Sequence, residues 1–290
     1  MKMNKQINIY VLVLSIFFIL IIASCSSAPK NPGDIYNLRN QAEEGLKTSN
    51  KEAGQGNLER ALTLLTGYKR QAILADDPSL IIRICLSRGN VLFSLGRTEE
   101  AFAEWDFALG EAEKFRDSEL LSVSRIFYAR GNLISGRVTA QTVLDEVNRE
   151  SVNIKKDRLY IAFSWQVRGL ALRSLGRYTE AENAVKRSLE IHEKDRYLEN
   201  ASYDWYIIAS IRSLAGNTAG ALQALETSIT IDRRIENSWG LAASWRAVGD
   251  VYHKAGRNNE ALEAYRRARA IFAAIGNEHE VAEIDNRINN

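Results

Sequence analysis

The sequence of 290 residues predicts an all-α protein built as a solenoid of about six helical hairpins. The first observation is a set of six glycines that recur every 40 residues: Gly56, Gly96, Gly136, Gly176, Gly216 and Gly256. A stack of similar two-helix units must turn at the same place in each unit, so this spacing is typical of a repeat array. The second observation is that no proline follows Pro78. Proline inside a helix costs about 3 kcal/mol, and its absence favours long helices.

Residues 1–24 have the layout of a secretory signal peptide. Two lysines precede an apolar run from Ile7 to Ala23 that ends in small residues. The run closes with the letters IASC, which resemble the bacterial lipobox, and the resemblance implies that Cys25 is acylated after the leader is cut. We expect a lipid anchor at Cys25 and a flexible tether over residues 25–33. The alternative is an uncleaved membrane span, because about 20 apolar residues cross a bilayer.

Residues 34–290 are predicted to form the solenoid domain. Counted from each turn glycine, most units place a small residue five positions later and a large one nine positions later, as in Ala261 and Tyr265. Before the glycine a large, a small and a large residue stand at helical spacing, as in Trp245, Gly249 and Tyr252. Residues three and four apart share one face of a helix, so each unit is expected to contain two helices that pack face to face.

These columns resemble the signature of the tetratricopeptide repeat, on the following residues: Trp245, Gly249, Tyr252, Gly256, Ala261, Tyr265 and Ala268. The resemblance covers about residues 34–290. It implies a right-handed superhelix whose concave groove, lined by the first helix of each unit, binds peptides or proteins. The family period is usually 34 residues, so a period of 40 predicts longer helices. Val281, Ile284 and Ile288 lie on one face of an otherwise polar segment, which predicts a C-terminal capping helix.

Two units depart from the pattern. The third has Gln141 and Asp145 where alanine and a large apolar residue are expected, so its second helix is predicted to be shortened or shifted. The shifted core would use Val143, Leu144 and Val147. In the first unit the two signature columns hold glycine and serine, at positions 45 and 49, and we expect this hairpin to fray.

The chain offers little for catalysis. His192, His253 and His279 fall at different phases of the repeat, so we expect surface histidines and no metal site. No phosphate-cradling or nucleophile-elbow motif is present, and Cys85 follows an apolar helical stripe that predicts a core position. Without the two leader lysines the charges balance at 36 basic and 36 acidic residues, which argues against nucleic acid as a partner. We expect no enzymatic activity and no cofactor.

Binding is the better hypothesis. Residues that the resemblance places in the groove are partly apolar and partly polar, which suits a peptide, an extended segment or an amphipathic helix. The candidate partner-binding residues are Asn90, Arg130, Gln166, Arg173, Tyr203, Tyr206, Arg246, Asp250 and His253.

The sequence leaves three candidate functions. The leading one is a lipid-anchored scaffold or adaptor of the bacterial cell envelope that binds a protein or peptide partner. Ser26 follows the anchor cysteine where an inner-membrane retention signal has aspartate, so the outer membrane is expected. The second is a small-molecule or peptide receptor, or an accessory subunit of a solute transporter, with a pocket near Tyr203, Tyr206 and Trp239. The third, an enzyme, would require Asp250, His253 and a further acid within hydrogen-bond reach.

Overall fold

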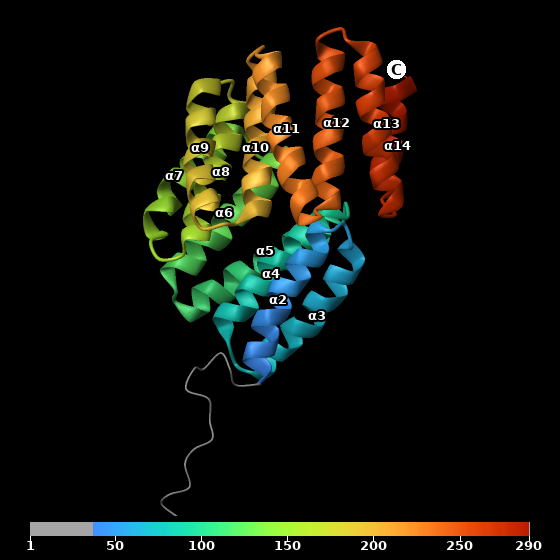
Figure 1. Cartoon of the computed structure of the whole chain (residues 1–290). Helices are drawn as coiled ribbons and strands as arrows, with labels where there is room; N and C mark the ends of the chain where they lie inside the picture. The colour runs from blue at the N-terminus through green and yellow to red at the C-terminus, as the bar shows by residue number, and fades with distance from the viewer. Residues whose placement is uncertain (1–36, 290) are drawn as a thin grey trace, which may run out of the picture.

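The computed structural model describes residues 37–289, which contain α-helices and one short 3-10 helix and no strand (Figure 1). The signal peptide, Cys25 and the tether lie outside the described residues. The elements are α2 (Leu38–Gly54), α3 (Leu58–Leu74), α4 (Pro78–Ser94), α5 (Thr98–Phe115), α6 (Ser118–Ile134), α7 (Ala140–Glu150), η2 (Ser151–Asn153), α8 (Arg158–Ser174), α9 (Tyr178–Lys194), α10 (Leu198–Leu214), α11 (Thr218–Ile235), α12 (Ser238–Lys254), α13 (Asn258–Ala274) and α14 (Glu278–Asn289). None of these helices is long and apolar enough to cross a membrane. The all-α solenoid predicted from the sequence is confirmed.

The turns inside the hairpins lie at the periodic glycines. All six have positive φ, between 67° at Gly136 and 91° at Gly56. The Gly96 N–H donates to the carbonyl of Phe93 at 3.1 Å, and the next N–H donates to the carbonyl of Leu92 at 2.9 Å. This pair of bonds satisfies carbonyls that the end of a helix leaves free, and glycine adopts the required conformation without steric cost. The turns predicted at these glycines are therefore confirmed.

A second series of turns lies between the hairpins. Twenty residues after a turn glycine the backbone again has positive φ, at Asp76, Arg116, Arg196 and Glu236. Side chains make this left-handed conformation costlier by roughly 1–2 kcal/mol, and single residues tolerate it. Apart from α7, which begins at Ala140, the helices begin at regular intervals of 20 residues along the chain, as Leu38, Leu58 and Pro78 do.

The first helices form the inner layer of the solenoid. Each of α2, α4, α6, α8 and α10 contacts the first helix of the following unit, whereas no comparable contact joins second helices within residues 37–289. Helices on the inside of a curve lie closer together than those outside it, so the even-numbered helices line the concave side. A continuous apolar core runs between the layers, and a smaller one lies under α14. Cys85 is part of the core as expected, and burial raises its pKa to about 12.

The third unit is irregular in the way its sequence predicts. Helix α7 has 11 residues, against 17 or 18 in the other second helices, and it buries Val143, Leu144 and Val147. Gln141 and Asp145 are exposed. The shortened helix is thus a second helix that packs with its own set of apolar residues.

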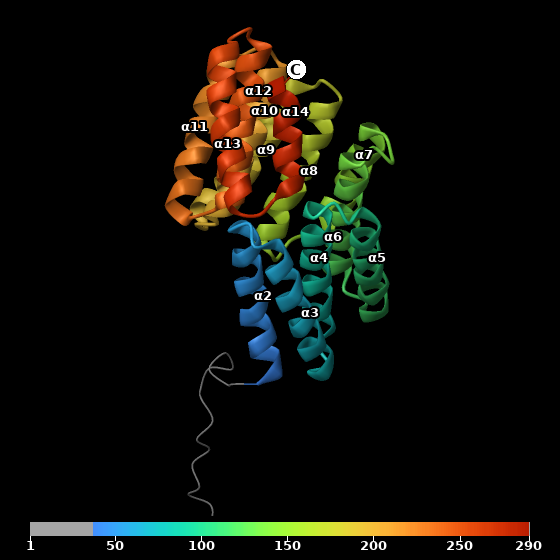
Figure 2. The ribbon, with the colours of Figure 1, turned by 90° about the vertical axis from the view of Figure 1, so that its right-hand side faces the viewer.

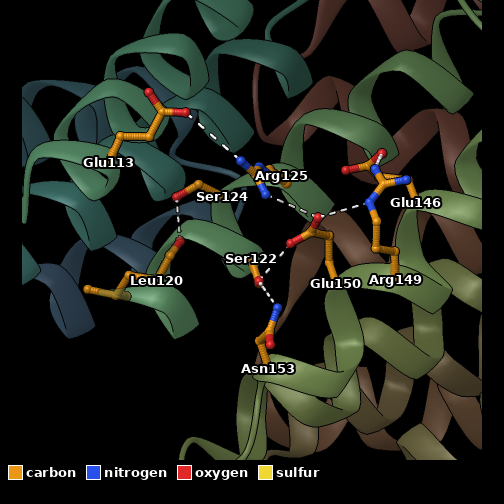
Figure 3. A network of polar contacts seen from close by, with 9 residues as sticks. All are labelled: Glu113, Leu120, Ser122, Ser124, Arg125, Glu146, Arg149, Glu150 and Asn153. Carbon is orange, nitrogen blue, oxygen red and sulfur yellow. Dashed lines mark hydrogen bonds and ion pairs between the residues drawn. The ribbon is translucent and has the colours of Figure 1, made fainter. Parts of the chain in front are cut away.

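Polar contacts hold the end of α7 to α6. Figure 3 shows the buried carboxylate of Glu150 accepting hydrogen bonds from Ser122 Oγ at 2.7 Å and from Arg125 Nη1 at 3.2 Å. Asn153 Nδ2 donates in turn to Ser122 Oγ at 3.1 Å. Buried polar groups need such partners, since leaving one unpaired costs about 1–3 kcal/mol. The early end of α7 is therefore a defined feature of the fold.

The first unit forms a full hairpin. Helices α2 and α3 each have 17 residues, so the expected fraying is not present. Ser49 is buried and its Oγ donates to the carbonyl of Gly45 at 2.7 Å. A Cβ at Gly45 would lie 2.4 Å from ring carbons of Tyr68, so the glycine makes room for this ring. Gly45, one of the two residues that weaken the sequence signature, is thus small because Tyr68 packs there.

The two ends of the solenoid meet. Helix α2 contacts α12, and both views show the α2–α3 hairpin below the last units (Figures 1 and 2). A Cβ at Gly54 would lie 2.2 Å from Glu199 Oε1, and one at Gly56 would lie 2.7 Å from Ile275 Cδ1. The turn of the first hairpin therefore packs against α10 and against the turn that precedes α14.

Candidate functional site

The inner face, defined here as the exposed surface of the first helices α4, α6, α8, α10 and α12, carries most of the sequence-predicted site residues. Asn90 on α4 and Arg130 on α6 occupy the same position in consecutive units. Both are partly buried, and neither Asn90 Oδ1 nor Arg130 Nε has a hydrogen-bond partner in the described chain. Both atoms are shielded from water and lack, among the described residues, the partners that such atoms normally have.

The inner face of the next two units has a hydrogen bond between side chains of adjacent helices and a pair of stacked rings. Arg173 Nη1 on α8 donates to Ser210 Oγ on α10 at 3.1 Å. Tyr203 and Tyr206 stack with their ring centroids 5.9 Å apart, and burial raises the pKa of Tyr206. No ion pair within residues 37–289 neutralises Arg130 or Arg173. The middle of the inner face therefore combines unpaired cations with aromatic rings.

The capping helix α14 occupies the inner-face residues of the last unit. Arg246 Nη1 forms an ion pair with Glu280 of α14. Asp250 accepts a hydrogen bond from the Tyr265 hydroxyl at 2.8 Å and lies 3.3 Å from Arg287 Nε. His253 is exposed nearby. The predicted cap thus exists, and it provides partners within the chain for Arg246 and Asp250.

Gln166 is not on the accessible surface. It is 4% exposed, and its Nε2 donates to Asp204 Oδ1 at 2.8 Å. The other carboxylate oxygen of Asp204 lies 2.6 Å from Nδ1 of His192, which is 1% exposed. The expectation that all three histidines lie at the surface is wrong for His192, although His253 and His279 are exposed.

Ser188, His192 and Asp204 have the composition of a catalytic triad and the wrong geometry. Ser188 Oγ lies 3.4 Å from His192 Nδ1, the same nitrogen that faces Asp204. A triad needs the serine at Nε2, so that the imidazole can take the hydroxyl proton while the acid orients its other nitrogen. Here Nε2 is buried without a partner. This cluster is structural.

The acid–base arrangement considered at Asp250 is likewise not assembled. No hydrogen bond joins Asp250 to His253 among residues 37–289, and the groups around Asp250 are a tyrosine and an arginine. No cluster of three histidine, cysteine, aspartate or glutamate side chains suited to a metal ion occurs in the same stretch.

Two hollows open on the surface of the described residues. One, of about 380 Å³, lies between α12, α13 and α14, and its lining includes Asp250 and His253. The other, of about 470 Å³, lies between α7, α8 and α9, and its lining includes Trp165 and Arg168. Sequence reasoning missed the second hollow, because it depends on how α7, α8 and α9 pack against one another.

Comparison with known proteins agrees with this architecture. Tetratricopeptide-repeat family models match residues 168–194 and 200–274, which lie between α8 and α13. BtubC (BKLC) from P. vanneervenii is similar, with a TM-score of 0.53 and 16% identity over 76% of this chain and 92% of that one. A Rap protein complexed with competence and sporulation factor has a TM-score of 0.57 and 16% identity over 86% of this chain and 76% of the other. No curated protein matches the chain.

Proposed function

We propose that the protein is a lipid-anchored scaffold of the bacterial cell envelope that binds a peptide or protein partner on the inner face of its repeat solenoid. The observation that carries the proposal is the pair Asn90 and Arg130, at equivalent positions of adjacent units, each of which has one polar atom without a hydrogen-bond partner within residues 37–289. Repeat solenoids use extended concave surfaces for binding. The Rap protein of similar fold was solved with a bound factor, which supports a ligand-binding role for this architecture.

The polar groups on the inner face suggest what the partner presents. Arg130 and Arg173 can each donate several hydrogen bonds to carbonyl or carboxylate oxygens, and Asn90 can both donate and accept. Tyr203 and Tyr206 of α10 add two stacked aromatic rings to the same set of helices. Arginine and tyrosine are frequent energetic anchors at protein interfaces. An extended or helical segment with alternating polar and apolar side chains fits this surface.

The test of partner binding is crosslinking in cells, followed by mass spectrometry, with the Arg130→Ala/Arg173→Ala double variant. We expect the crosslinked partner to disappear while the helical circular dichroism signal is retained. Arg60→Ala, on the exposed side of α3, is the matched control and is expected to retain the partner. Undiminished capture by the double variant would refute the inner-face assignment.

The anchor at Cys25 is proposed from the lipobox resemblance, together with a location at the outer membrane. Cys25→Ser is expected to move the protein from the membrane to the soluble fraction. Several acyl chains hold a protein stably at a membrane, and the variant has no cysteine to carry them. Continued membrane association of this variant would favour an uncleaved span. Separation of inner and outer membranes on a density gradient checks the location.

A ligand receptor, or an accessory subunit of a transporter, is the second candidate. The contact between α2 and α12 favours it, since a superhelix whose ends meet encloses its inner face. Two indole nitrogens are also buried without partners in the described part of the chain, that of Trp205 on α10, the helix of the stacked tyrosines, and that of Trp239 on α12. A receptor is expected to show a rise in melting temperature with a small ligand and no protein partner. A scaffold would show that rise only with the partner.

A further inference from the structure

The hollow beside α7 lies on the outer side of the solenoid, where the second helices α7 and α9 flank the first helix α8. Its volume of about 470 Å³ falls in the range of ligand pockets, roughly 300–1,000 Å³. The residues that line it are Gln141, Leu144, Asn148, Trp165, Arg168, Leu172, Arg177, Glu180, Asn183, Ala184 and Arg187. Apolar side chains and a tryptophan are therefore combined with three amides and a net positive charge.

The irregular third unit keeps this hollow open. Helix α7 is shorter than the other second helices and covers less of α8. Its end is fixed by the Glu150 network in Figure 3, and the chain that follows is fixed by Glu119. Glu119 Oε1 accepts hydrogen bonds from the N–H groups of Lys155, Lys156 and Asp157 at 3.1, 2.9 and 3.1 Å. A hollow whose walls are held by such contacts is preformed.

Arg168 is the charged group of the hollow that lacks an acidic partner. Its Nε donates to Asn148 Oδ1 at 2.8 Å, and its guanidinium carbon lies 4.7 Å from the ring centroid of Trp165. Within residues 37–289 it forms no ion pair, whereas Arg177 is paired with Glu180 at 2.6 Å. Burial lowers the pKa of Arg168, as expected for a partly desolvated cation without a neighbouring anion. Two of the five guanidinium N–H groups point to Asn148, which leaves donors for a ligand.

The repeat provides an internal comparison. Two units earlier the equivalent arginine, Arg88, forms an ion pair with Glu104 at 3.2 Å. The residue equivalent to Glu104 in the fourth unit is Ala184. The carboxylate that neutralises the arginine in the second unit is thus missing in the fourth, and the space where it would lie is part of the hollow.

We infer that the hollow between α7, α8 and α9 is a binding site for the carboxylate group of an acidic partner polypeptide, with Arg168 as its ion-pairing residue. The carboxylate takes the place that Glu104 occupies beside Arg88. Gln141, Asn148 and Asn183 present amides at the rim, which can pair with the backbone of the bound segment. The site is separate from the inner face and does not depend on the function proposed for that face.

The test is fluorescence anisotropy with the full-length protein in detergent. The probes are a labelled pool of short glutamate-rich peptides and a matched labelled pool with glutamine in place of glutamate. Binding of N-acetylglutamate and of inorganic phosphate, which carry no label, is measured as a rise in melting temperature. We expect the glutamate pool to bind at least about tenfold more tightly than the glutamine pool, the change typical of losing a hydrogen bond to a charged group. Arg168→Gln and Ala184→Glu should each weaken binding by a similar factor. Arg88→Gln is the matched control and should bind as the wild type does.

Other outcomes overturn the inference. Equal binding of the two pools, or unchanged binding by Arg168→Gln, would remove the carboxylate site. Binding of phosphate alone, or of N-acetylglutamate without the peptides, would exclude an acidic polypeptide as the ligand. Arg130→Ala separates the two faces: if this variant loses the peptides while Arg168→Gln keeps them, the peptides bind on the inner face. Melting curves confirm that each variant is folded.

Discussion

Trp105 on α5 lies directly against Gly89 on α4: a Cβ added at this glycine would be 2.1 Å from the indole Nε1. On the other side of the ring, a Cβ at Gly131 of α6 would be 2.3 Å from Cζ3. The indole Nε1 donates to the carbonyl of Leu86 at 3.3 Å, and the side chain is fully buried. One large residue therefore fills the junction of the second and third units because two first helices have no side chain there.

We predict that Gly89→Ala lowers the free energy of unfolding by about 1–3 kcal/mol, since the added methyl group overpacks the core at Trp105. Gly67→Ala on α3 is the control, because nothing lies within 4 Å of a Cβ at that position. It should raise stability by about 0.5–1 kcal/mol through helix propensity. Urea unfolding followed by tryptophan fluorescence measures both. Equal effects of the two substitutions would contradict the packing described here.

Asp204→Ala is expected to lower the free energy of unfolding by about 3–5 kcal/mol. The substitution leaves the side chains of His192 and Gln166 buried and without their shared acceptor. Ser188→Ala should cost less than about 1 kcal/mol, because its contact with His192 is long, at 3.4 Å. Thermal and urea unfolding of the two variants test this difference. A loss in Ser188→Ala as large as that in Asp204→Ala would show that the serine is equally important.

The contribution of Asp232 to stability should fall as the pH rises from about 4 to about 6. Burial raises the pKa of Asp232 from its ordinary 3.8 to about 6, despite hydrogen bonds from Ser228 and Asn237 that act in the opposite direction. In this window the Asp232 carboxyl of the folded chain keeps a proton that the unfolded chain has released. The stabilisation that this carboxyl contributes is therefore lost as the pH rises through the window. Melting temperatures measured across the window should decrease by a few degrees. Asp232→Asn should make this part of the profile flatter, and an unchanged slope would contradict the assignment.

Glu119→Ala is predicted to loosen the segment between η2 and α8. One carboxylate oxygen accepts hydrogen bonds from three successive backbone N–H groups there, those of Lys155, Lys156 and Asp157. Hydrogen exchange at these three amides should become at least about tenfold faster in the variant, since local opening no longer breaks charge-assisted bonds. Amides in the middle of α10 are the internal reference and should keep their wild-type rates.

Sequence reasoning succeeded where each residue's role depends on its own unit. The turn at Gly96 follows from the intrinsic freedom of glycine, and the short helix α7 follows from Gln141 and Asp145 standing where apolar residues belong. The left-handed conformation of Asp76 and Arg116 could not be foreseen, because a residue with a side chain in this conformation leaves no mark in the composition. Local rules are readable from one sequence, while tolerated exceptions to them are not.

The parts that could not be foreseen depend on contacts between units. Gln166 was placed on the inner face by its position in the repeat, yet it turns to Asp204 in the following unit. Arg246 was likewise placed on the inner face by its position in the repeat, yet it forms an ion pair with Glu280 of the capping helix α14. The contact between Gly56 and Ile275 depends on small rotations between neighbouring units that add up over the whole array. An accumulated rotation of this kind cannot be read from the sequence of any one unit.

The contact between the first turn and the last units limits how this array can change its length. An open solenoid gains or loses whole hairpins without disturbing the others, because every unit touches only its neighbours. Here the addition or removal of a hairpin would separate Ile275 from Gly56 and Glu199 from Gly54. The number of repeats is consequently a structural constant of this protein, like the strand number of a closed barrel. Diversification must proceed by substitution within hairpins, as the third unit illustrates, instead of by duplication.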